Sequence, residues 1–196
     1  MRYEHREGIN LRGRLVAKGS ISLARRFSRD ERGATAVEFG FVALPFLALM
    51  MALLEAGLLF FAAQTLDTAT VRAARLIRTG QAQQQNFDAD QFKERICDVV
   101  GLFMSCENLR VEVRTYTDFD RVDLSPPSME SGELPDDFAF EPGNGGDIVV
   151  VRAFYEWPVF LNLLGGGFAG LPNGNRLLIA AAAFRNEPFP WSSPPP

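Results

Sequence analysis

The clearest pattern along this chain of 196 residues is an uninterrupted apolar run near its N-terminus. From Phe39 to Ala63, 25 residues contain one ionisable side chain, Glu55. As a helix rising about 1.5 Å per residue, this run would extend about 37 Å, more than the roughly 30 Å of a bilayer's hydrocarbon core. A core helix of a soluble protein, the alternative, would normally carry a polar stripe. The run therefore predicts a transmembrane helix.

The helical pattern continues past the apolar run as an amphipathic segment. One helix over 34–79 would contain 46 residues and extend about 69 Å, and its second half would leave the bilayer as a stalk. Gly80 is a natural stop, and Pro45 should kink the helix or remove one backbone hydrogen bond. Apolar residues keep helical spacing on one side of the stalk, and the other side carries Arg72, Arg75 and Arg78. These arginines form either a solvated or headgroup-contacting face or a binding site.

The rest of the chain predicts a small head. Asp88 and Gln91 form a capping box before a short helix whose apolar face contains Phe92, Ile96, Val99 and Val100. Alternating residues from Leu109 to Tyr116 predict a half-buried strand. Segments 147–160 and 176–189 predict two more strands, although the alanines at 180–183 also fit a helix.

The predicted fold class is α+β: a long N-terminal transmembrane helix that continues as a stalk, then a small exported head with a short helix and about three antiparallel strands. We expect a leader at 1–33, the helix and its extension at 34–80, and the head at 81–196. Within the head, 124–146 is an acidic, irregular loop rich in Pro, Gly and Ser, and 81–87 is a polar linker. An apolar, glycine-rich connection precedes the third strand, and the Pro-rich C-terminal tail is expected to be extended.

Charge divides the chain. Residues 1–33 hold nine Lys and Arg against four Asp and Glu, a net charge of +5, so the totals of 20 and 24 leave −9 for the remainder. The basic flank predicts a cytoplasmic N-terminus and an exported C-terminal part. A nucleic-acid-binding arm is the competing interpretation, but membrane topology explains the same charges.

The candidate chemistry of the exported part is limited to two cysteines. Cys97 and Cys106 are candidates for a structural disulfide in an oxidising compartment, with free thiols as the alternative. The sole histidine, His5, lies in the leader, so we expect neither a metal site nor a cofactor. No nucleophile elbow or phosphate loop is present in the sequence, and the adjacent Asp136 and Asp137 give no basis for acid–base catalysis. We expect a protein that is not an enzyme.

A short motif stands at the cytoplasmic edge of the apolar run. Gly33 is followed by Ala34, three more uncharged residues, Glu38 and the aromatic Phe39. These residues resemble the processing site of type IV prepilins, which a peptidase cuts after the glycine. A glycine fits a tight protease cleft, and a carboxylate near hydrocarbon needs a partner. The cleavage after Gly33 that the resemblance implies would create one, the α-amino group of Ala34 in the same or a neighbouring subunit. Alternatively, Glu38 marks the headgroup boundary and Gly33 is an incidental hinge.

The resemblance extends beyond this motif. With Pro45, Glu55, the Arg72–Gly80 segment and the C-terminal "RNEPF", the chain from about residue 29 to 190 resembles the TadE-like family of tight-adherence pilus assembly proteins. The resemblance implies a minor pilin or pseudopilin of the Flp-type system. It also implies an exported α+β domain and processing by a prepilin peptidase.

The resemblance further implies partners and a location. The partners are a TadF-like protein, the major Flp pilin, the inner-membrane assembly machinery and the lipid bilayer, without nucleic acid. The location is the bacterial inner membrane, single-pass, with a periplasmic head, and the sequence leaves open whether the processed chain enters the fibre. Glu55 either contacts a partner helix or reaches toward water. The competing function is a single-pass sensor or binding protein, which would keep its leader.

Overall fold

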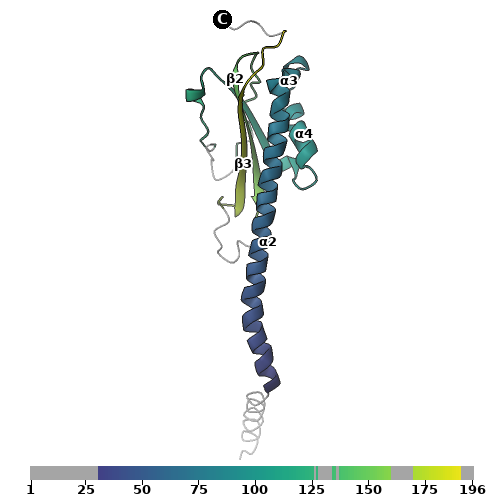
Figure 1. Ribbon diagram of the computed structural model, residues 1–196, viewed down its shortest axis with the longest axis vertical. Coiled ribbons are helices and arrows are strands. Elements are labelled where there is room, and N and C mark those ends of the chain that lie inside the picture. Colours follow the sequence, from purple (N-terminus) through teal and green to yellow (C-terminus); the bar gives the residue numbers. More distant parts are fainter. Residues whose placement is uncertain (1–30, 126, 128–133, 136, 160–169, 191–196) are drawn as a thin grey trace, which may run out of the picture. The chain divides into compact units, whose positions relative to one another are not determined.

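The computed structural model describes residues 31–125, 127, 134–135, 137–159 and 170–190 (Figure 1). The chain divides into two compact units, Met1–Met50 and Met51–Pro196. The expectations for most of the leader, for the glycine-rich part of the apolar connection and for the end of the tail lie outside the described residues.

Helix α2 (Glu31–Arg78) confirms the helix expected over 34–79. Its 48 residues continue through Pro45, whose ring removes one N–H donor from the helical ladder without ending the helix. By length and composition it can cross a membrane from Gly33 onward, and 11% of its most apolar stretch is buried. A core helix of a soluble protein would be mostly buried, so the exposure favours a lipid-facing helix.

The expected stop at Gly80 is confirmed. Gly80 has a φ of +77°, and its N–H donates to the carbonyl of Ile77. The ring of Phe189 covers this turn so closely that a Cβ on Gly80 would lie 2.6 Å from it.

The segment before Phe189 fastens the C-terminus to the end of α2. The N–H of Glu187 donates to the carbonyl of Arg78 at 2.9 Å, and the Glu187 carboxylate lies 3.3 Å from the Arg78 guanidinium. Asn186, which is buried, donates to the carbonyls of Pro142 and Asn144. This segment therefore supplies a partner for one carbonyl that the helix end leaves unbonded.

The expected polar linker is partly helical: α3 (Gln81–Gln84) forms one turn directly after Gly80. Helix α4 (Ala89–Val100) begins at the predicted capping box. Gln91 N–H donates to the Asp88 carboxylate at 2.8 Å, and Asp88 N–H donates to the Gln91 side chain at 3.2 Å. Short 3₁₀ turns η1 (Cys106–Asn108) and η2 (Phe119–Arg121) precede and follow the first strand.

Three antiparallel strands form the sheet in the order β1-β2-β3, so the predicted fold class is confirmed. They are β1 (Leu109–Tyr116), β2 (Ile148–Pro158) and β3 (Asn175–Arg185). Ala180–Ala183 pair with residues 153–150 of β2, which decides between strand and helix for the alanine run. In the sheet, β2 provides the hydrogen-bond partners for the N–H and C=O groups of these alanines, which a helix would have provided within itself.

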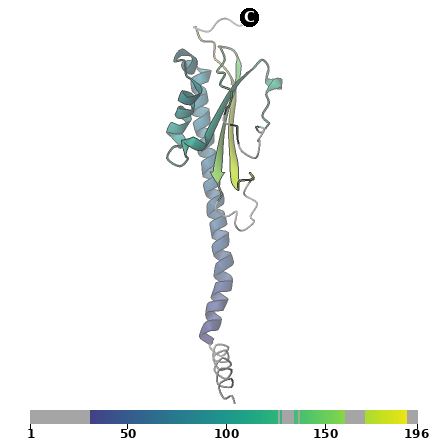
Figure 2. The ribbon, with the colours of Figure 1, turned by 180° about the vertical axis from the view of Figure 1, so that it is seen from behind.

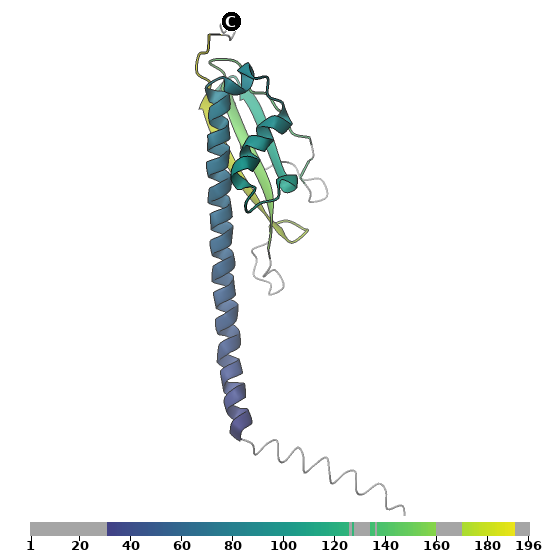
Figure 3. The same cartoon turned by 90° about the vertical axis from the view of Figure 1, so that its right-hand side faces the viewer.

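The core lies between one face of the sheet and two helices. Figures 1 and 3 show α4 beside the C-terminal part of α2, both on the same face of the sheet. The α2 residues fully buried there recur at helical spacing. The largest buried side chains of this core from the helices are Leu66, Ile77, Phe92, Ile96 and Val100.

The opposite face of the sheet is covered only in part. β1 is half-buried as predicted except at Glu112, whereas Arg114 of β1 and Ile179 of β3 stay exposed. Figure 2 shows the segment with η2 on the side away from the helices. Phe138 stacks on Phe154 with ring centroids 5.1 Å apart, and residues 139–141 pair with Val113 along the outer edge of β1. Glu112, on the predicted polar face, is consequently 2% exposed.

Candidate processing and assembly site

The Gly33–Ala34 peptide bond lies in the first turn of α2, which begins at Glu31. Gly33 and Ala34 are exposed, and nothing lies within 4 Å of a Cβ built on Gly33. A protease cleft takes an extended backbone, so this turn must unwind before cleavage. Glycine lowers helix stability by roughly 0.5–1 kcal/mol relative to alanine. Unwinding is therefore easier at Gly33 than it would be at an alanine.

Glu38 follows Ala34 by one helical turn. Residues four apart share a face of a helix, and both side chains are exposed. Removal of residues 1–33 would turn the Ala34 nitrogen into a charged α-amino group at the N-terminus of α2. The Glu38 carboxylate would then lie one helical turn from that charge, at a helix end where the dipole favours an acid.

Phe39 is 73% exposed and begins a helix surface that is apolar on all sides. Between Phe39 and Met50, even the least exposed residues, Gly40 and Ala43, are only partly covered. Water does not stabilise such a surface, so lipid or neighbouring helices must surround it.

Glu55 differs from its neighbours because it is buried, with 8% of its surface exposed. It lies at helical spacing from Leu59 and Ala62, and this stripe leads to Leu66 in the core. The structure thus turns Glu55 toward the head side of α2 and not toward the outward apolar face. The sequence indicated an unusual acid in the apolar run but not the face it occupies.

Cys97 and Cys106 form a disulfide between α4 and η1, with Cα atoms 5.8 Å apart. Their sequence separation of nine residues closes a short loop. Closing a loop of this length stabilises the folded state by about 2–3 kcal/mol in the chain-entropy description.

Arg72, Arg75 and Arg78 line one wall of a groove of about 820 Å³. The other wall is the outer part of β3 from Ala181 to Phe184. All three arginines are exposed, and Arg78 also pairs with Glu187. The groove therefore offers positive charge beside an edge strand, within the second compact unit.

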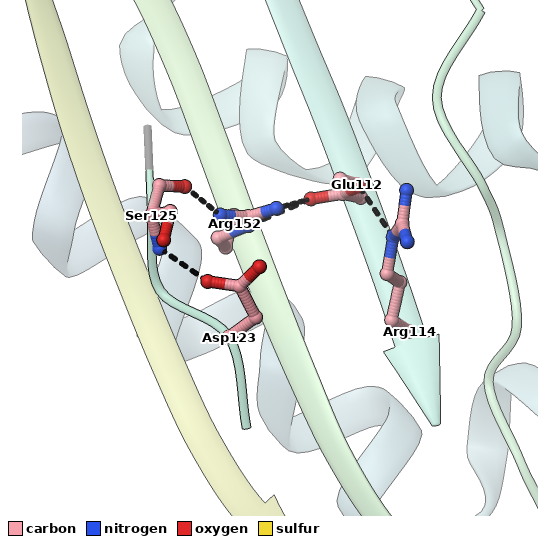
Figure 4. A network of polar contacts seen from close by, with 5 residues as sticks. All are labelled: Glu112, Arg114, Asp123, Ser125 and Arg152. Atoms are coloured by element: carbon pink, nitrogen blue, oxygen red, sulfur yellow. Dashed lines mark hydrogen bonds and ion pairs between the residues drawn. The ribbon is translucent and has the colours of Figure 1, made fainter. Parts of the chain in front are cut away.

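A polar network that the sequence did not predict crosses β1 and β2 (Figure 4). Glu112 accepts hydrogen bonds at 2.6 Å from Nε of Arg114 and from Nε of Arg152, and Arg152 Nη2 also pairs with it. Nη1 of Arg152 donates to the carbonyl of Ser125 at 2.7 Å. The network thus ties the covering segment to the sheet and lines a cavity of about 480 Å³. An arginine inside the apolar run of β2 was the available signal.

Hydrogen bonding shifts the pKa of two side chains beside this cavity, Arg114 and Asp123. The hydrogen bond to Glu112, reinforced by its negative charge, raises the pKa of the Arg114 guanidinium. The Ser125 side chain and N–H lower the pKa of the exposed Asp123 carboxyl, to which that N–H donates at 2.8 Å. Both groups are therefore held in their charged forms.

A long apolar helix in front of a small α+β unit is typical of a membrane-anchored protein. The model of the family described as TadE-like protein matches residues 33–75. This match confirms the resemblance to the TadE-like family over these residues, from Gly33 to Arg75. The resemblance suggested for the rest of residues 29–190 lies outside the match. The search of curated proteins and the search of solved structures gave no match.

Proposed function

We propose that this chain is a minor pilin, or pseudopilin, of a tight-adherence pilus system. A prepilin peptidase cuts after Gly33 on the cytoplasmic side of the inner membrane. The mature chain of 163 residues then stays in the bilayer through α2 and carries its head in the periplasm. Its role is to aid pilus assembly with other pilins and the inner-membrane machinery, without catalysis of its own.

One observation carries this proposal: the TadE-like match begins at Gly33, and Glu38 follows one turn after Ala34 on the helix that the match covers. The exposed apolar surface of α2 fits lipid before assembly and other pilin helices after it.

Processing tests the proposal directly. The chain is co-expressed with a prepilin peptidase, and the product is analysed by intact mass and N-terminal sequencing. We expect an N-terminus at Ala34. A chain that stays at full length with an active peptidase would contradict the proposal and favour the competing function, a single-pass sensor or binding protein.

A matched pair of variants locates the site. Gly33→Leu should block cleavage and leave membrane insertion unchanged, because a bulky side chain does not fit where the backbone must enter the cleft. Gly40→Leu is the control, since Gly40 lies in the same helix with nothing within 4 Å of its Cβ position. It should be cut like the unchanged chain. Normal cleavage of Gly33→Leu would show that the site lies elsewhere.

A further inference from the structure

The turn after α4 exposes two large apolar side chains. Leu102 is 86% exposed and Phe103 is 60% exposed, and we call this pair the apolar tip. The tip lies between Cys97 and Cys106, so the disulfide closes the loop that carries it. An exposed Leu–Phe pair in a cross-linked loop is an unfavourable surface in water.

The tip is held in one position by its neighbours. The N–H groups of Phe103 and Met104 both donate to the carbonyl of Val100, and Met104 is buried. The N–H of Ser105 donates to the Tyr155 hydroxyl of β2 at 3.1 Å. The backbone on either side of the tip is therefore fixed to the core, and only the two apolar side chains project.

Phe103 also contacts α2 directly. Its ring meets the ring of Phe61 edge-on, with centroids 5.3 Å apart and planes at 88°. Leu54, Leu58 and Phe61 follow one another on one outward face of α2, and each is more than half exposed. The apolar tip therefore lies beside the last turn of the exposed apolar surface of α2, at Phe61, and widens that surface.

The surface of α2 changes just beyond this level. Gln64 and Asp67 are exposed within the next two turns, and the arginine groove follows. A change from exposed apolar to exposed polar residues along one helix is typical of the boundary between hydrocarbon and water. The tip lies at that boundary.

We propose that Leu102 and Phe103 insert into the membrane surface as a second lipid contact of the head. The inference rests on the proposed function, because it requires α2 to span the bilayer. The partner is lipid at the headgroup–acyl boundary, since the tip is continuous with the lipid-facing surface of α2 and residues 101–105 carry no charge. Two contacts, a helix and a tip, restrict the rotation of the head about α2 more than the helix alone.

Depth-dependent fluorescence quenching tests this contact. Phe103→Trp is made in the full chain and reconstituted into phosphatidylcholine–phosphatidylglycerol vesicles that contain lipids brominated near the headgroup. Phe119→Trp is the matched control, because Phe119 is 53% exposed and follows the other end of β1. Trp157 and Trp191 contribute the same background to both variants.

We expect the brominated lipids to reduce the added fluorescence of Phe103→Trp by about twofold and to leave that of Phe119→Trp unchanged. Equal quenching of the two variants would overturn the inference. The inference would also be overturned if the new tryptophan were shielded from water only at high protein-to-lipid ratios, because that would indicate contact with another protein and not with lipid. Matching circular dichroism spectra and an intact disulfide by mass confirm that both variants fold.

Retention of the chain in vesicles after an alkaline carbonate wash separates the two proposals. A chain that is washed out contradicts the membrane anchoring of the proposed function. A chain that is retained but shows no quenching at position 103 contradicts only the lipid contact of the tip.

Discussion

The burial of the Glu112 carboxylate could not be predicted from the alternation of residues along β1. Alternation along β1 placed it correctly on the face opposite Val113, but alternation does not report whether that face meets water. The antiparallel register puts Glu112 directly across from Arg152, and both are buried under the segment that Ser125 attaches. The apolar run of β2 interrupted by one arginine was consistent with such a pair. The ion pair with Arg152 and the burial of both side chains depend on how the segment around Ser125 packs, and this packing leaves no periodic pattern in the sequence.

Replacing Glu112 tests how much the network stabilises the head. Glu112→Leu leaves the Arg152 charge, whose side chain is 11% exposed, without its carboxylate, and should lower the free energy of unfolding by about 3–5 kcal/mol. Glu112→Leu/Arg152→Met should recover much of this loss, because neither charge remains buried. Denaturation of the processed chain in detergent, followed by circular dichroism, measures both values.

The control for this experiment is an exposed ion pair on α4. Arg95 and Asp98 lie 3.7 Å apart with about half of each side chain exposed, so Asp98→Ala should change the unfolding free energy by less than about 1 kcal/mol. A loss for Glu112→Leu no larger than that of the control would mean that the network contributes little to stability.

Among the elements, those with strong periodic patterns were predicted best. The apolar run and its amphipathic continuation gave α2 almost to its ends, and Asp88 with Gln91 gave the start of α4. The turn of α3 was missed because its glutamines carry no apolar face; it follows from packing of Ala82, which is buried. Glu55 was noted as unusual, but its burial depends on which face of α2 the head covers.

The end of α2 can be tested at Gly80. Gly80→Ala forces an alanine to a φ of +77° and places its Cβ 2.6 Å from the ring of Phe189. Backbone strain of this kind costs about 1–3 kcal/mol, and the contact with the ring adds to it. We therefore expect a loss of stability in thermal denaturation together with loosening of the C-terminal segment.

Gly146→Ala is the matched control for the helix end. Gly146 also has a positive φ, +91°, but nothing lies within 4 Å of its Cβ position. Its alanine variant carries the backbone strain alone, so it should be less destabilised than Gly80→Ala. Equal losses in the two variants would show that Phe189 does not restrict the turn.

For the whole molecule, the proposed insertion, processing and assembly would all involve the same helix, α2. The apolar surface of α2 is suited to lipid, and its first turn holds the bond that the proposed peptidase cuts. Its last turns form part of the core of the head. Under the proposed function, a contact at Glu38 would form only after processing, so the carboxylate would serve assembly and not insertion.

Glu38→Gln separates assembly from the earlier steps. The amide keeps the size of the side chain and removes the charge that would face the new α-amino group of Ala34. At about 4 Å and an effective dielectric constant near 20, that attraction is about 4 kcal/mol before desolvation is counted. We expect normal insertion and normal cleavage after Gly33, with at least about a tenfold loss of processed chain cross-linked to the major pilin in membranes or sheared fibres, because every 1.4 kcal/mol changes an equilibrium tenfold. Glu38→Asp, which keeps the charge, should retain part of the cross-linking. If Glu38→Gln cross-links as well as the unchanged chain, the carboxylate marks only the headgroup boundary, and assembly depends on the apolar surface of the helix.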